Sequence, residues 1–159
     1  MIKPITKSDL SNCLDILKTG YEDGAIRFGQ TEENCPYRGR TRLPLSELEK
    51  QFLEGCQMYG YYYDDKLVGF LSLEFFHDDS MGINDLAILP EYQNNGFGSE
   101  LIQFSKETAY QHKCVKIRLG MIDDNAKLKK WYEKHGFSTV RLVKYDMVTY
   151  MVGKMEFIL

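Results

Sequence analysis

The sequence predicts a mixed α/β fold, in which a central, mostly antiparallel sheet of about six or seven strands carries helices on both faces. Two apolar segments joined at Asp64-Asp65 predict a β-hairpin. A strand, a helix and a strand then follow one another over residues 81–121, and such a crossover requires strands that run parallel. A second strand pair closes the chain over residues 137–158, so the other neighbouring strands are expected to run antiparallel.

The first half of the chain predicts a strand, two helices and the strands of the hairpin. Residues 1–6 are expected to form the strand, and Ser8-Asp9 can cap a helix that ends at Gly20. A long irregular connection over residues 20–43 follows, and connections of this length often carry function. A capping-box spacing at Ser46 then opens a second helix. The hairpin strands are MYGYYY and KLVGFLSLEFF.

The second half predicts three further strands and two helices beyond the hairpin. A turn at residues 77–80 leads to a strand over residues 81–89, and the next helix runs from residue 97 to about residue 112. The segment VKIRLGM is a strand, and Asp123 or Asp124 caps a helix that stops at Gly136. The expected order is strand, two helices, three strands, helix, strand, helix and two strands.

Composition limits the class of protein. The 159 residues fit a single domain over residues 1–159, and a net charge of −3 argues against nucleic acid as the main partner. No apolar run approaches the ~20 residues that span a membrane, and the N-terminus carries no secretion signal. The four cysteines are scattered without a CxxC pair, so we expect no metal site and reduced thiols in a cytoplasmic protein.

A glycine-rich loop at the mouth of the helix after residue 96 is the clearest functional signal. The stretch PEYQNNGFGSELI, residues 90–102, places Gly96 and Gly98 between a strand and a helix. Glycine permits positive φ and close approach of a ligand, and a helix N-terminus offers free N–H groups, so together they can bind a phosphate. The loop is neither a P-loop nor a GxGxxG dinucleotide fingerprint. A tight turn without a ligand is the alternative interpretation of the same glycines.

Two motifs resemble the GNAT superfamily of N-acetyltransferases. The run LAILPEYQNNGFGSELI is similar to the family's strand, proline, aromatic and Q/R-x-x-G-x-G/A motif. The run NAKLKKWYEKHGF, residues 125–137, is similar to its second motif, with Asn125 and Tyr132 at the family's spacing. The resemblance extends over nearly the whole chain and is specific over residues 83–137, and the predicted element order agrees with the family's fold.

This resemblance implies transfer of an acetyl group from acetyl-coenzyme A to an amine of a small molecule or a protein, by direct attack in a ternary complex without a metal. It implies that Tyr132 protonates the leaving thiolate and that the N–H of Ile88 stabilises the oxyanion. Asn125 lies about two helical turns before Tyr132, so both can face one cleft, although Asn125 can equally be a helix cap. The expected coenzyme-binding residues are Leu86, Ala87, Ile88, Gln93, Asn94, Asn95, Gly96, Phe97, Gly98, Ser99, Asn125 and Tyr132.

The general base and the acceptor are left open. Asp85 or Glu74 is a candidate base, and a water relay without a single base is an alternative. In the loop over residues 20–43, acidic and aromatic residues suit a cationic amine, whereas arginines suit a carboxylate or phosphate. A non-catalytic coenzyme A-binding module and a nucleotide-binding protein are the alternative functions. The final strand can pair between subunits, so a homodimer is possible.

Two neighbours of the motif tyrosine are interpreted as structural. Trp131 is expected to belong to the core. His135 is expected at the surface, near the C-terminus of its helix, where the helix dipole favours it.

Overall fold

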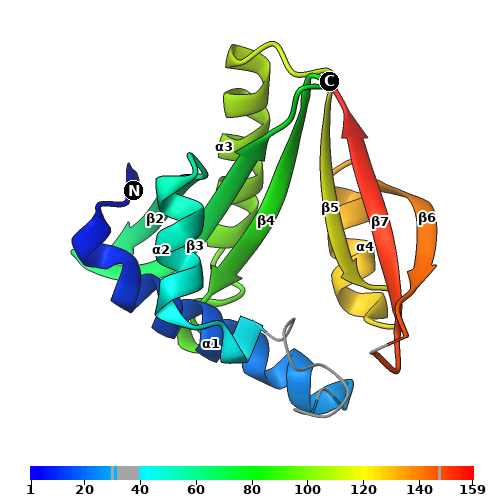
Figure 1. The fold of residues 1–159 in the computed structure, drawn as a ribbon, viewed down its shortest axis with the longest axis horizontal. Coiled ribbons are helices and arrows are strands. Elements are labelled where there is room, and N and C mark those ends of the chain that lie inside the picture. Colours follow the sequence, from blue (N-terminus) through cyan, green and yellow to red (C-terminus); the bar gives the residue numbers. More distant parts are fainter. Residues whose placement is uncertain (30, 32–39, 147) are drawn as a thin grey trace.

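A computed structural model describes residues 1–29, 31, 40–146 and 148–159. Within them, seven strands form one sheet in the order β1-β2-β3-β4-β5-β7-β6 (Figure 1). Only β4 and β5 pair in parallel, and all other neighbours are antiparallel. The strands are β1 Ile2–Pro4, β2 Gln57–Tyr63, β3 Lys66–Phe75, β4 Ser80–Ile88, β5 Lys116–Ile122, β6 Ser138–Lys144 and β7 Met151–Ile158. The predicted mixed, mostly antiparallel sheet is confirmed.

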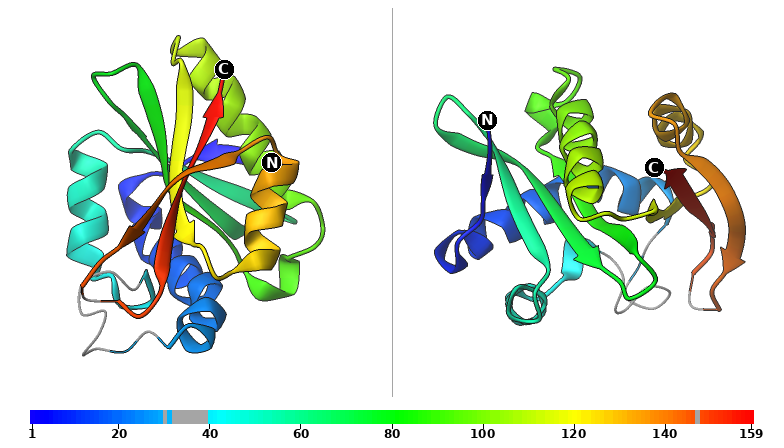
Figure 2. Two further views of the ribbon diagram at one scale, coloured as in Figure 1. Left: turned by 90° about the vertical axis from the view of Figure 1, so that its right-hand side faces the viewer. Right: turned by 90° about the horizontal axis from the view of Figure 1, so that it is seen from above.

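In the described residues, four α-helices cover the two faces of this sheet (Figures 1 and 2). They are α1 Leu10–Arg27, α2 Leu45–Leu53, α3 Phe97–Gln111 and α4 Ala126–Lys134. Apolar side chains of α1 and α2 share one core with the sheet, and those of α3 and α4 share another. We call the two sides of the sheet the α1 face and the α3 face. The predicted element order and the helices on both faces are confirmed.

The sheet opens between its two parallel strands. The ladder joins only Ser80–Gly82 of β4 to Lys116–Arg118 of β5. Beyond these residues the two strands diverge, as Figure 1 shows. A register shift in β4 at Asn84 interrupts the pairing with β3 next to this opening. Backbone groups of β4 that a neighbouring strand would otherwise bind therefore face the gap.

The first helix is longer than the sequence predicted. It does not end at Gly20 but continues through Gly24 to Arg27. A Cβ atom at Gly20 would lie 3.1 Å from the Cβ of Ala87, so the glycine lets α1 approach β4 closely. Glycine is unfavourable inside a helix by roughly 1 kcal/mol, and packing against the sheet outweighs that cost. The predicted irregular connection is correspondingly shorter, and its residues 30 and 32–39 lie outside the described residues.

Two smaller expectations are corrected. Asp123 or Asp124 was expected to cap α4, with Asn125 as an alternative cap, and the cap is Asn125, whose Oδ1 accepts a hydrogen bond from the N–H of Leu128 at 3.2 Å. The last strand, β7, lies between β5 and β6, so both its edges are occupied and it cannot pair with a second subunit in the way the sequence suggested. In the described part of the chain, no helix combines the length and apolar character that a membrane span requires.

Candidate active site

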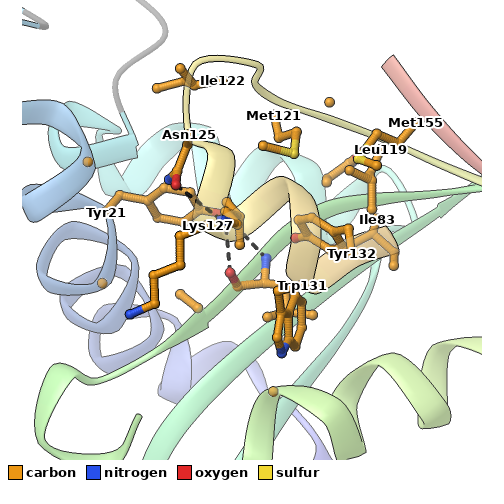
Figure 3. Close-up of a pocket in the computed structure, with 18 of the residues that line it drawn as sticks. Tyr21, Ile83, Leu119, Met121, Ile122, Asn125, Lys127, Trp131, Tyr132 and Met155 are labelled. Atoms are coloured by element: carbon orange, nitrogen blue, oxygen red, sulfur yellow. Dashed lines mark hydrogen bonds between the residues drawn. The ribbon is translucent and has the colours of Figure 1, made fainter. Parts of the chain in front are cut away.

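A cavity of about 1520 Å³ occupies the gap between β4 and β5. Residues of α1, β4, β5, α4, β6 and β7 line it, together with the glycine loop before α3. Figure 3 shows Tyr21 reaching toward it from α1, and Asn125, Trp131 and Tyr132 from α4. Segments far apart in the sequence therefore meet around one opening in the sheet.

The glycine loop turns the chain sharply into α3. Gly96 is the residue before the helix and has a φ of 87°, in the left-handed region that favours glycine. A Cβ atom there would meet no atom within 4 Å, so the space beside it is open. Among the residues that the structure describes, no side chain caps the first turn of α3, which leaves its N-terminal N–H groups for another partner. Such a helix start favours an anion.

Side chains before the helix hold this loop in shape. The amide of Gln93 donates to the backbone oxygen of Ile88 at 3.1 Å. The amide of Asn95 donates to the backbone oxygens of Tyr92 and Gln93 at 3.1 and 3.2 Å. The predicted loop residues Gln93, Asn94, Gly96, Phe97, Gly98 and Ser99 all line the cavity, whereas Asn95 does not.

Trp131 and His135 support the loop from α4, a role that the sequence did not predict. The indole of Trp131 lines the cavity, and its Cζ2 would lie 3.3 Å from a Cβ atom at Gly98. His135 is half-buried, and its Nδ1 lies 2.8 Å from the backbone oxygen of Trp131. Since a carbonyl only accepts, Nδ1 carries the proton. In neutral His135, Nε2 then accepts from the hydroxyl of Ser99, which lies 3.0 Å away.

The backbone of β4 presents its groups to the cavity at alternate residues. The N–H of Leu89 donates to the oxygen of Val68 on β3. By alternation, Ala87 also points its backbone groups at β3, whereas Leu86 and Ile88 point theirs into the gap. The hydroxyl of Tyr21 donates to the oxygen of Leu86 at 3.3 Å and accepts from its N–H at 3.4 Å.

Tyr132 lies deep in the cavity wall. It is only 8% exposed and packs edge-on against the rings of Trp131 and Phe137. Burial raises the pKa of the Tyr132 phenol well above its ordinary value, and the nearby phenol of Tyr21 raises it further. Tyr132 therefore retains its proton at neutral pH. Asn125, the cap of α4, lines the same cavity, as its spacing from Tyr132 predicted.

The two candidate bases do not line the cavity. Asp85 is 1% exposed and faces the α1 side of the sheet, in register with Ser72. Glu74 accepts a hydrogen bond of 2.9 Å from the amide of Asn84, and this asparagine, not Glu74, lines the cavity. Within the described residues, the acidic residues of the cavity wall are Asp23 and Glu156, two that the sequence had not singled out as bases.

No group of three or more possible metal ligands gathers anywhere in the described residues.

Comparison with known proteins identifies a shared family and fold. The model of the acetyltransferase (GNAT) family matches residues 26–137. An uncharacterised N-acetyltransferase of Bacillus licheniformis is 31% identical over 116 residues, and the match covers 65% of this chain and 66% of that protein. The chain thus spans just under two thirds of the length of the curated relatives it matches.

Two solved structures have the same fold over nearly the whole chain. The PaiA N-acetyltransferase of Thermoplasma acidophilum, in complex with coenzyme A, has a TM-score of 0.82 at 18% identity and covers 100% of this chain and 98% of its own. The ribosomal-protein-S18-alanine N-acetyltransferase of Escherichia coli has a TM-score of 0.80 at 14% identity and covers 99% and 92%.

Proposed function

The chain belongs to the GNAT family of acetyltransferases, and we propose that it transfers the acetyl group of acetyl-coenzyme A to an amine by direct attack in a ternary complex. One observation carries the proposal: the uncapped start of α3 at Gly96 and the buried phenol of Tyr132 open on the same cavity. The coenzyme A bound by the T. acidophilum protein supports it. All strands from β1 to β7 belong to one sheet, which supports a single acetyltransferase domain over residues 1–159.

The coenzyme lies on the α3 face of the sheet in this proposal. Backbone N–H groups from about Asn94 to Ser99 bind the pyrophosphate, because they are clustered, uncapped and reinforced by the dipole of α3. The pantetheine arm enters the gap beside β4 and pairs with the backbone of Leu86 and Ile88. Tyr21 occupies the groups of Leu86 in the free protein, so its hydroxyl must move aside or share them.

The chemical step needs three contributions. The amine nitrogen attacks the thioester carbon, and the N–H of Ile88, which points into the gap, stabilises the oxyanion of the tetrahedral intermediate. When the C–S bond breaks, Tyr132 gives its proton to the coenzyme A thiolate, and its raised pKa keeps that proton in place until then. Asp85 and Glu74 lie outside the cavity wall, and the two carboxylates that line it, Asp23 and Glu156, are held in ion pairs, so in this proposal the amine loses its proton to water.

A coenzyme A-binding module without catalysis is the second candidate, because the glycine loop alone would suffice for binding. The position of Tyr132 favours the enzyme. A binding module does not need a buried phenol at the site of the thioester, and burying the hydroxyl has a cost unless it is used or bonded.

The proposal is tested by thermal unfolding with coenzyme A, acetyl-coenzyme A and ATP, followed by an acetylation assay on a panel of amines. A ligand that binds only the folded state raises the midpoint. We expect both coenzyme forms to raise it and ATP not to. Product formation by the wild type and its loss in Tyr132→Phe support the enzyme, whereas binding without turnover of any amine supports the module.

A further inference from the structure

Basic side chains outnumber acidic ones in the wall of the cavity. Among the described residues, five basic and two acidic side chains line the cavity, although the whole chain has a net charge of −3. The basic residues are Arg27, Arg118, Lys127, Arg141 and Lys154, and the acidic residues are Asp23 and Glu156. The acidic pair is already neutralised, because Asp23 lies 2.7 Å from Arg27 and Glu156 lies 2.8 Å from Lys116 outside the wall.

Arg118 and Lys154 project from the α1 face, away from the glycine loop. On β5, Ile117 and Leu119 belong to the core shared with α3 and α4. Arg118 alternates with them and therefore faces the other side of the sheet. Gly120 lies two residues further on this side, and Lys154 of β7 is its partner in the ladder. These two cations consequently do not share a face with the proposed phosphate site.

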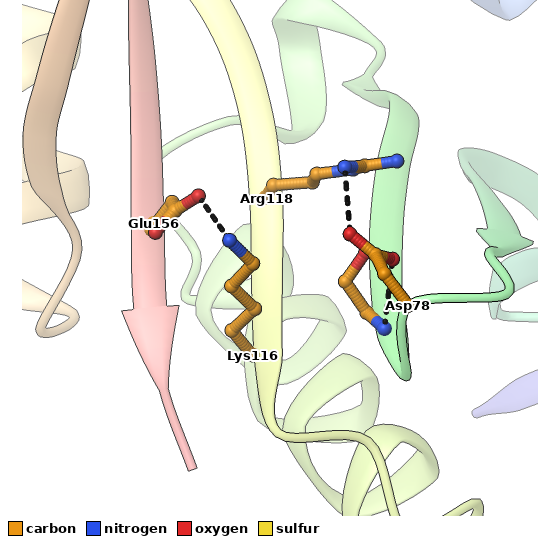
Figure 4. Close-up of polar contacts among 5 residues, drawn as sticks. Asp78, Lys116, Arg118 and Glu156 are labelled. Carbon is orange, nitrogen blue, oxygen red and sulfur yellow. Dashed lines mark hydrogen bonds and ion pairs between the residues drawn. The ribbon is translucent and has the colours of Figure 1, made fainter.

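Neither cation makes a short ion pair in the described part of the chain. Lys154 has no carboxylate at ion-pair distance there, and its Nζ lies 5.8 Å from the ring centre of Tyr145. Arg118 extends toward Asp78, while Lys116 extends toward Glu156 (Figure 4). The Arg118–Asp78 contact is 3.5 Å long and both side chains are substantially exposed, at 38% and 56%. An exposed pair of this kind contributes little, so a ligand can replace it.

The surroundings of the two cations form a pocket wall for a short ligand. The guanidinium of Arg118 lies 3.7 Å from the ring centre of Phe76, which also lines the cavity. Gly120 has no side chain, and a Cβ atom there would lie 3.4 Å from the Nζ of Lys154. The missing side chain therefore leaves the ammonium of Lys154 exposed to the cavity, with the ring of Tyr145 as its aromatic neighbour.

We propose that the acceptor is an amine that also carries a carboxylate, and that Lys154 and Arg118 bind this carboxylate on the α1 face of the cleft. The proposal rests on the proposed acetyltransferase function. A guanidinium and an ammonium suit a carboxylate, and Arg118 can bind it in a bidentate manner. A diamine would instead bring a second positive charge beside two existing ones. The cleft thus selects against a purely cationic acceptor.

The test compares acceptors that share an amine and differ at the far end. Short linear ω-amino carboxylates are assayed beside their amides and the diamines of equal length, at saturating acetyl-coenzyme A. We expect kcat/KM for the best carboxylate to exceed that of its amide and its diamine by about tenfold or more. Equal or faster acetylation of the amides or diamines would overturn the proposal.

Variants assign the preference to the two side chains. Lys154→Gln and Arg118→Gln are each expected to lower kcat/KM for the carboxylates by about tenfold while the amides change by less than about twofold. Lys154→Glu is expected to reverse the preference in favour of diamines. Lys66→Gln, an exposed lysine in the β2–β3 hairpin, is the matched control and should change nothing. An equal loss of kcat/KM for carboxylates and amides would mean that Lys154 and Arg118 do not bind the carboxylate of the acceptor.

Coenzyme binding separates the two possible failures. If acetyl-coenzyme A raises the unfolding midpoint and every carboxylate-bearing amine remains unreacted, the acceptor assignment is wrong and the coenzyme site stands. If acetyl-coenzyme A does not bind, the proposed function itself fails. The unfolding midpoints of the variants without ligand show whether each is folded.

Discussion

The two faces of the cleft are built in different ways. On the α3 face, the proposed coenzyme site is one continuous segment, from Leu86 to Ser99, supported by α4. On the α1 face, the proposed acceptor site brings together side chains of β5, β7 and the turn after β3. The first uses backbone N–H groups and the second uses side-chain charge. A site of backbone groups leaves a local pattern in the sequence, whereas a site of dispersed side chains exists only in the fold.

The largest effect on activity is expected for a substitution of Tyr132 in the cavity wall. Tyr132→Phe removes the proton donor without changing the ring, so kcat should fall on the order of 100-fold. The dissociation constant of coenzyme A should change by less than about threefold, because the phosphates lie elsewhere. Steady-state kinetics and a coenzyme titration measure the two quantities. An unchanged kcat would remove Tyr132 from the mechanism.

The pH dependence of kcat tests the role of Tyr132 independently. Burial raises the pKa of Tyr132, so its protonated form persists to higher pH than that of a free phenol. We therefore expect no decline of kcat from its ionisation below about pH 10. A decline near neutral pH that Tyr132→Phe abolishes would contradict this assignment.

The next largest effect, on coenzyme A affinity and on stability, is expected for a substitution in the glycine loop. Gly96→Ala places a residue with a Cβ at a φ of 87°, which should lower the free energy of unfolding by about 1–2 kcal/mol. Its methyl group also projects into the open space at the helix start, so coenzyme A should bind about tenfold more weakly.

Gly55→Ala is the matched control for the loop. Gly55 has a φ of 98° and open space around it, but it does not line the large cavity. It should show a similar loss of stability in denaturant titrations without any loss of coenzyme affinity. Equal affinity losses in both variants would mean that strain alone accounts for the effect at Gly96.

A change on the α1 face should act on the acceptor only. Gly120→Val fills the space beside Lys154, and the atom nearest to the new Cβ is the Nζ of Lys154, the end of a flexible side chain, so the fold should accommodate it. We expect the KM for the amine to rise about tenfold and the KM for acetyl-coenzyme A to stay within about twofold. A higher KM for acetyl-coenzyme A with an unchanged KM for the amine would place the coenzyme on the α1 face and contradict the assignment of the two sites.

The smallest effect is expected at Ser99. When His135 is neutral, the hydroxyl of Ser99 donates its proton to Nε2 of His135, so the side chain cannot also donate that proton to a phosphate. Ser99→Ala retains the backbone N–H, and coenzyme affinity should change by less than about twofold in calorimetric titrations. A tenfold loss would show that the hydroxyl itself binds the coenzyme.

The sequence predicted the fold and the glycine loop because both depend on local patterns. Strand alternation, turn residues and the two glycines at the start of α3, Gly96 and Gly98, can be recognised without knowing the neighbours. The end of α1 was mispredicted because Gly20 is normally a helix terminator, and its packing against Ala87 is a tertiary contact.

The wall of the cavity could be predicted only in part. Asp85 and Glu74 were plausible bases because alternation cannot say which face borders the cleft, and the register shift at Asn84 changes the alternation just there. The support of Ser99 by His135 joins residues 36 positions apart. The pairing of Gly120 with Lys154 depends on the order of β5 and β7 in the sheet. No local pattern carries this information.

The most direct test of the account is a titration of coenzyme A followed by tryptophan fluorescence. Trp131 is the single tryptophan of the chain, lines the cavity and covers Gly98. If the coenzyme binds on the α3 face, the emission of Trp131 should change saturably with coenzyme A, and the curve should shift about tenfold in Gly96→Ala. If coenzyme A raises the unfolding midpoint while the emission of Trp131 stays constant, the coenzyme binds elsewhere and the assignment of the two faces is wrong.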